Sequence, residues 1–145
     1  NFCFIGEPGV GKTHSLIAIG RDLCRKGYTV YFYTAIQLTT LLEEAQERKE
    51  LSSFMERLKK AKLLIIDELG FVPFSERSSR LLFDVFSQRY ENGYIAVTSN
   101  LSFEKWSQVF GGVELTAALL DRFTHKADIY LFDGGSARLR DALKK

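Results

Sequence analysis

The first strong constraint on this chain is the stretch Gly6-Glu7-Pro8-Gly9-Val10-Gly11-Lys12-Thr13, which has the pattern G-x-x-x-x-G-K-S/T. Five mostly apolar residues, NFCFI, precede it, and an amphipathic segment follows it. This order is typical of a strand, a phosphate-binding loop and a helix. The glycines allow the backbone to wrap tightly, so that its N–H groups and the helix N-terminus face phosphate oxygens.

The residues at the end of the loop predict specific contacts with a nucleotide. Lys12 is expected to reach the β- and γ-phosphates, and the hydroxyl of Thr13 is expected to ligate Mg²⁺. His14, which follows Thr13, is expected to contact the nucleotide but to have no catalytic role. The loop leaves open whether the bound nucleotide donates a phosphoryl group to a substrate or switches the shape of the protein.

Length and composition favour a single cytoplasmic domain. The chain has 145 residues, of which 46% are hydrophobic, and no apolar run reaches the length of a membrane span. No basic region precedes an apolar one at the N-terminus, so no signal peptide is predicted. The two cysteines, Cys3 and Cys24, are expected to be buried free thiols.

Charge alone does not indicate a nucleic-acid partner. The net charge is only +2, and the basic clusters RLKKAK (57–62) and RLRDALKK (138–145) are of a kind that usually forms solvated surface.

Short apolar runs alternate with longer amphipathic stretches, which predicts an α/β fold with a parallel sheet and helices on its faces. The expected strands are 2–5, 28–34, 62–68, 94–100 and 127–132. The expected helices are 12–26, 35–50, 51–60, 75–91, 103–110 and 114–125.

Two carboxylates, Asp67 and Glu68, end the apolar run KLLIIDE. Ligands of open parallel sheets bind at the C-terminal ends of the strands, so Asp67 is expected to reach the Mg²⁺ shell. Glu68 is expected to polarise a water for attack on the γ-phosphate. A residue poised to activate water favours hydrolysis over transfer to a metabolite.

Two further candidates remain open from the residues alone. Asn100 ends the strand YIAVTSN and is either a turn-forming residue or a group that holds the attacking water. Arg122 lies late in the helix LTAALLDRFTH and is either a surface residue or one that reaches the nucleotide of a neighbouring subunit.

Together these blocks resemble an AAA+ ATPase, and more narrowly the IstB/DnaC-like branch. The segments GEPGVGKTHSLIAIGRDLCRKGYTVYFYTAIQL, LLIIDELGFVPFS, TSNLSFEKWSQVFGG and LTAALLDRFTH are similar to that family in order and spacing. The resemblance covers essentially the whole chain, and SNLSFEKWSQVFG is most similar to IstB, the helper ATPases of insertion-sequence transposition.

The resemblance implies a P-loop NTPase core with a five-stranded parallel sheet in the order 5-1-4-3-2, with ATP and Mg²⁺ as ligands. It implies that Asn100 is the sensor-one residue and that Arg122 is an arginine finger acting across a subunit interface. It also implies a nucleotide-sensing role for Arg138 in GGSARLR, although Ala137 replaces the usual tyrosine before it.

The family also implies ATP-dependent assembly of subunits on duplex DNA with little sequence preference, and stimulation of a transposase. The alternatives are a DnaC-like loader of a replicative helicase, a P-loop kinase of small molecules, and a nucleotide-binding scaffold that barely hydrolyses. Because the chain starts inside a strand, residues 1–145 are expected to be a cropped AAA+ core. The N-terminal region that contacts partners or DNA is then missing, and little or no lid is present.

Overall fold

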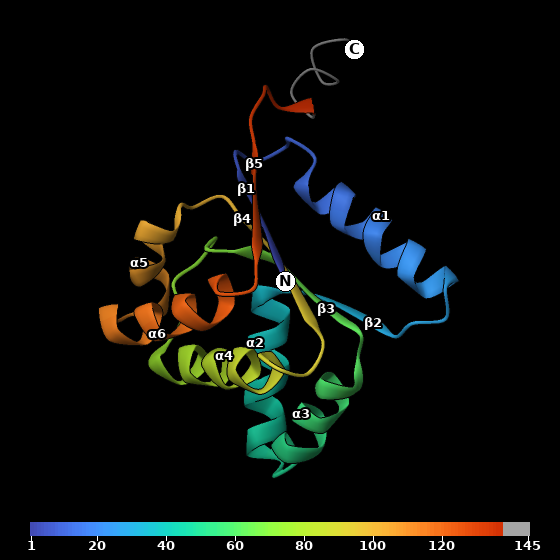
Figure 1. Ribbon diagram of the computed structural model, residues 1–145. Helices are drawn as coiled ribbons and strands as arrows, with labels where there is room; N and C mark the ends of the chain where they lie inside the picture. Colours follow the sequence, from blue (N-terminus) through green and yellow to red (C-terminus); the bar gives the residue numbers. More distant parts are fainter. Residues whose placement is uncertain (138–145) are drawn as a thin grey trace, which may run out of the picture.

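The computed structural model of the protein describes residues 1–137. Its centre is a five-stranded parallel sheet in the order β2-β3-β4-β1-β5 (Figure 1). The strands are β1 (Phe2–Gly6), β2 (Val30–Thr34), β3 (Leu63–Leu69), β4 (Tyr94–Ser99) and β5 (Asp128–Phe132). The predicted strand order is therefore confirmed.

Six α-helices and a short 3₁₀ helix connect the described strands. They are α1 (Lys12–Arg25), α2 (Ala35–Glu47), α3 (Leu51–Lys60), α4 (Glu76–Arg89), η1 (Phe103–Lys105), α5 (Trp106–Phe110) and α6 (Val113–Thr124). Each predicted helix is present with boundaries within a few residues of those expected, and η1 and α5 divide the segment expected at 103–110. Within the described chain, residues 133–137 follow β5.

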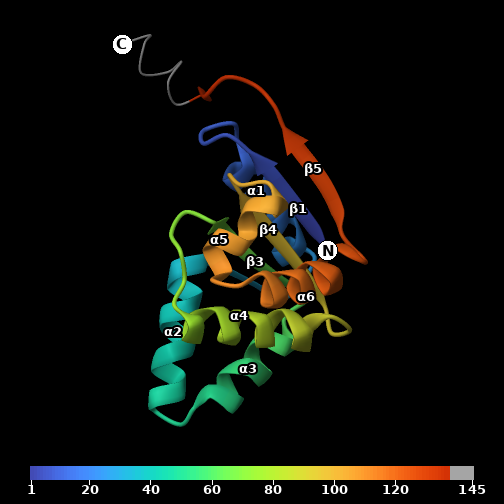
Figure 2. The same cartoon turned by 90° about the vertical axis from the view of Figure 1, so that its left-hand side faces the viewer.

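The two faces of the sheet are covered unequally. Helices α2 to α6 pack on one face around the larger apolar core, whereas α1 covers the other face (Figures 1 and 2). Strand β3 shows why the central strands are continuously apolar: Leu64 and Ile66 belong to the larger core, and Leu63 and Ile65 to the smaller one. Both faces of β3 are buried, as in parallel sheets with helices on each side.

Local side-chain chemistry sets the starts of two helices. At the start of α2, the hydroxyl of Thr34 accepts a hydrogen bond from the Gln37 N–H, and the Gln37 side chain accepts one from the Thr34 N–H. This reciprocal pair is a capping box. Ser75 caps α4 by accepting from the Ser78 N–H.

The prediction for the two cysteines is half wrong. Cys3 is buried, and burial raises the pKa of its thiol to about 12. Cys24, however, is exposed near the end of α1. Helix α1 packs on the sheet through Leu16 and Gly20, and Cys24, four residues after Gly20 on the same face, lies one turn beyond the last buried position. The spacing of apolar residues in the sequence did not distinguish the buried position of Cys3 from the exposed position of Cys24.

Residues 1–137 include no helix that is both long enough and apolar enough to cross a membrane.

Candidate nucleotide-binding site

The loop between β1 and α1 adopts a conformation that requires glycine at two positions. Gly9 and Gly11 have φ values of 85° and 99°, in the left-handed region that side chains disfavour. Gly11 also caps α1, where the Ser15 N–H and the Ser15 hydroxyl both donate to its carbonyl. The first turn of α1 therefore begins directly at Lys12, with the N-terminal end of the helix facing the loop.

Lys12 is largely buried and bonds to its own loop. Its ammonium donates to the carbonyl of Gly6 at 2.6 Å and to that of Glu7 at 2.8 Å. These contacts hold the cation at the entrance of the loop. An ammonium with rotatable donors can exchange carbonyl oxygens for phosphate oxygens with a small movement of its stem.

Asp67 lies at the end of β3 with its carboxylate turned toward α1. It is only 3% exposed, and its Oδ1 accepts hydrogen bonds from two hydroxyls. Thr13 of α1 donates to it at 3.0 Å, and Thr98 of β4 donates to the same oxygen. Because the Thr13 proton is committed to Asp67, the lone pairs of the Thr13 oxygen remain available for a cation.

Glu68 has a different environment from its neighbour. It is exposed and has a φ of 60°, which is unusual for a residue with a side chain. Its N–H donates to the Thr98 hydroxyl at 2.9 Å. The Glu68 side chain lines the same pocket as Lys12 and Thr13.

That pocket brings six of the predicted residues together at the C-terminal ends of the strands, while Asp67 lies beside it, hydrogen-bonded to Thr13. Its lining includes Pro8, Gly9, Lys12, Thr13, Glu68, Phe71, Thr98, Ser99 and Asn100. Asn100 places its Oδ1 in a buried position with no hydrogen-bond partner among the residues that the structure describes. An unpaired buried amide oxygen is costly, and it is expected to find a partner in a bound ligand or water.

Gly6, Glu7, Val10 and Gly11 belong to the loop without lining the pocket, and three other predicted residues lie outside both the loop and the pocket or outside the described chain. The side chain of His14 is exposed and does not line the pocket. Arg138 lies outside the described residues. Arg122 of α6 donates to the Ser87 hydroxyl of α4, and its guanidinium stacks 4.9 Å from the centre of the Phe83 ring.

The segment after β5 lies against the phosphate loop, as both views of the ribbon indicate (Figures 1 and 2). The Ala137 N–H donates to the Gly9 carbonyl at 3.0 Å. A Cβ on Gly9 would lie 2.3 Å from the Ser136 Oγ. Gly9 is therefore required by its φ, and a side chain there would also force the Ser136 hydroxyl to move.

The donor set fits a nucleoside triphosphate with Mg²⁺. Within residues 1–137, no group of three or more His, Cys, Asp or Glu side chains could hold a metal by itself. Mg²⁺ instead takes one or two protein oxygens and completes its octahedron with water and phosphate oxygens. Thr13 and Asp67, hydrogen-bonded beside the phosphate loop, supply such a pair.

The sequence profile of the family described as IstB-like ATP binding protein matches residues 1–145. The chain belongs to this family. The ATP-binding protein of insertion sequence IS5376 from Geobacillus stearothermophilus is 40% identical over 141 residues, covering 97% of this chain and 56% of that relative. The chain thus spans little more than half the length of this relative.

Solved structures show that the fold is that of an AAA+ domain. DnaA from Aquifex aeolicus, bound to AMPPCP, superposes with a TM-score of 0.78 at 24% identity, over 99% of this chain and 44% of that one. The DnaC helicase loader superposes with a TM-score of 0.77 at 20% identity, over 91% of this chain and 77% of that one. Family and fold together support an ATP-binding AAA+ protein whose relatives are described as insertion-sequence ATP-binding proteins.

Sequence reasoning did not assign a role to Thr98 or to Ser136. Thr98 was visible in the motif TSN, directly before Asn100, and a hydroxyl there could have been recognised as a partner for the neighbouring strand's carboxylates. Nothing in the sequence indicated that Ser136 would approach Gly9, because that contact depends on the path of the chain after β5.

Proposed function

We propose that the protein is a Mg²⁺-dependent ATPase that assembles on DNA and assists transposition, helping to select the target site and stimulating the transposase. The observation that carries the hydrolysis part is the placement of Glu68 beside Lys12 and Thr13, while the adjacent Asp67 is held by two hydroxyls. The association of its relatives with insertion sequences supports the transposition part.

In the proposed hydrolysis, each group of residues in the site has a separate role. The phosphate loop and Lys12 bind and orient the triphosphate, Thr13 and Asp67 hold the metal, and Glu68 accepts the proton of the attacking water. Mg²⁺, when bound, neutralises charge that develops on the phosphate oxygens. Asn100 fits the role of orienting the water or the γ-phosphate, because its buried oxygen has no protein partner in the described chain.

A DnaC-like helicase loader is the second candidate, and it is favoured by the likeness of fold to DnaC. It would use the same chemistry with single-stranded DNA and a replicative helicase as partners. Binding to a transposase rather than to a helicase separates the two.

A P-loop kinase would yield a phosphorylated metabolite, and its turnover would not change with DNA. A scaffold that barely hydrolyses would lose little turnover with Glu68→Gln.

The deciding experiment measures ATP turnover by the full-length protein with and without duplex DNA, with Glu68→Gln as the blank. We expect turnover that rises with DNA, disappears in the variant and becomes less DNA-dependent as salt is raised, because phosphate contacts release counterions. If ATP turnover were the same with and without DNA at every salt concentration, the proposed assembly on DNA would be contradicted. Only the ATPase part of the proposal would then remain.

A further inference from the structure

Strands β3 and β4 change register beside the nucleotide pocket. Ile66 pairs with Val97 and Leu69 pairs with Ser99, so two residues of β3, Asp67 and Glu68, lie opposite the single residue Thr98 of β4. This is the count of a β-bulge. The extra residue is Glu68, whose φ of 60° takes it out of the regular ladder.

One hydroxyl compensates for the interrupted ladder. Thr98 is 2% exposed, and its Oγ1 accepts the Glu68 N–H at 2.9 Å while it donates its proton to Asp67 Oδ1. A threonine hydroxyl donates one hydrogen bond through its proton and accepts hydrogen bonds through its two lone pairs. The bond to Asp67 therefore uses its only proton, and the bond from Glu68 uses one lone pair. No aliphatic side chain can make either bond.

Ser99 holds the other side of the same bulge. Its hydroxyl donates to the Leu69 carbonyl at 2.6 Å and accepts the Leu101 N–H at 3.1 Å. The two hydroxyls therefore fix the backbone before and after the point where Glu68 turns toward the pocket. A regular strand would point Asp67 and Glu68 to opposite faces of the sheet.

We propose that Thr98 is a positioning residue for ATP hydrolysis, assisted by Ser99. The proposal rests on the ATPase function proposed above. Thr98 does not contact the nucleotide in this role. It aligns the metal-binding carboxylate with Thr13 and holds the backbone of Glu68 where its side chain meets the attacking water. A displacement of a reacting group by about 1 Å is enough to lower a rate by about 10²-fold.

The test compares Thr98→Val, which keeps the shape and removes the hydroxyl, with Thr98→Ser, which keeps the hydroxyl. The matched control is Thr39→Val, because Thr39 is also a buried threonine but, among the described residues, donates only to the carbonyls of Ala35 and Ile36 in α2. Nucleotide affinity, kcat, KM and the Mg²⁺ concentration for half-maximal turnover are measured for each full-length variant.

We expect Thr98→Val to lower kcat by about 10²-fold and to require more Mg²⁺, with ATP affinity nearly unchanged. Thr98→Ser should recover most of the turnover, and Thr39→Val should match the wild type. A kcat of Thr98→Val close to that of the wild type would overturn the proposal. So would equal losses in Thr98→Val and Thr98→Ser.

Ser99→Ala keeps the experiment decisive if Thr98→Val does not fold. It releases the Leu69 carbonyl and the Leu101 N–H but leaves both bonds of Thr98, and we expect a smaller loss of kcat with unchanged ATP affinity. If Ser99→Ala instead lost ATP affinity and kcat together, the bulge would not serve positioning. If the wild type showed no turnover, the proposed ATPase function itself would be contradicted. If the wild type and Thr98→Val were both active, only the positioning role of Thr98 would be contradicted.

Discussion

Asp67 and Glu68 are adjacent in the chain but occupy opposite environments, one buried between two hydroxyls and the other exposed at the pocket. Their conservative amides are therefore predicted to fail in different ways. Asp67→Asn keeps an oxygen for Thr13 and Thr98 but loses the charge that attracts Mg²⁺, so more Mg²⁺ is needed for half-maximal turnover. Glu68→Gln removes the proton acceptor, so kcat falls by about 10²- to 10⁴-fold with ATP affinity retained.

Titrations of Mg²⁺ against turnover, together with binding of a fluorescent ATP analogue, distinguish the two variants. Excess Mg²⁺ is expected to rescue part of the activity of Asp67→Asn and none of that of Glu68→Gln. Rescue of both variants, or of neither, would mean that the division of roles between the two carboxylates is wrong.

At the scale of elements, the sequence predicted the strands and helices well because their apolar patterns are unambiguous. The run from Leu63 to Ile66 is apolar on both faces, and Gly27 and Pro73 separate helices from strands. The order of strands came from the family resemblance. The bulge at Glu68 could not be predicted, because a positive φ at a glutamate leaves no pattern in composition or spacing.

Arg89, at the end of α4, is the clearest case of a single side chain that joins several elements. It is 1% exposed and donates to the carbonyls of Leu58, Ala61 and Tyr94, at the end of α3, the loop after it and the start of β4. Burial lowers the pKa of its guanidinium to about 10. The cation still remains charged at neutral pH, held by backbone oxygens alone among the described residues.

Arg89→Met is therefore predicted to destabilise the protein by about 3 kcal/mol, because it leaves three buried carbonyls without a donor. The control is Arg80→Met, since Arg80 of the same helix forms an exposed ion pair with Glu76 at 2.7 Å and should cost less than about 1 kcal/mol. Urea unfolding followed by circular dichroism measures both. Equal losses in the two variants would show that Arg89 does not join these elements.

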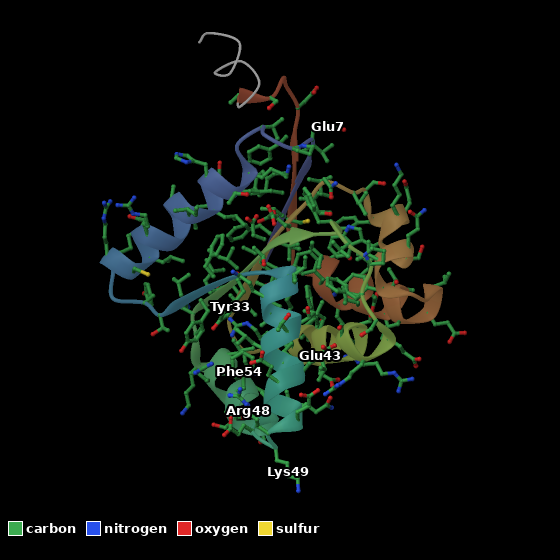
Figure 3. The ribbon with its side chains drawn as sticks, turned by 180° about the vertical axis from the view of Figure 1, so that it is seen from behind. Glu7, Tyr33, Glu43, Arg48, Lys49 and Phe54 are labelled. Atoms are coloured by element: carbon green, nitrogen blue, oxygen red, sulfur yellow. The ribbon has the colours of Figure 1, made fainter. Side chains whose placement is uncertain are left out.

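At the scale of the whole molecule, the phosphate pocket lies at the C-terminal ends of the strands and Arg122 lies in α6, close to the start of β5. The pocket is formed where the strands end, whereas Arg122 lies late in α6, bonded to Ser87 near the end of α4 and shortly before β5 begins. The tip of the α2–α3 hairpin, labelled by Arg48 and Lys49, is remote from Glu7 in the phosphate loop (Figure 3). Arg122 does not line the pocket and is bonded to Ser87, so we expect any catalytic role for it to be exerted on the site of a neighbouring subunit.

Mixing two inactive variants tests this expectation. Arg122→Ala is predicted to lose about 10³-fold in kcat, the lower end of the effect of an arginine finger. Glu68→Gln is inactive but still carries Arg122. In an equal mixture with head-to-tail contacts, about one quarter of the interfaces combine an intact Glu68 with a neighbour's Arg122, so turnover should recover to about that fraction of the wild type.

The control replaces Glu68→Gln in the mixture by the double variant Glu68→Gln/Arg122→Ala. This partner supplies neither a competent site nor an arginine, so no turnover should return. Recovery with the single variant but not with the double one requires that Arg122 acts across the interface, because no other residue differs between the two mixtures. If neither mixture recovers although both assemble with ATP, Arg122 serves only its contacts with Ser87 and Phe83.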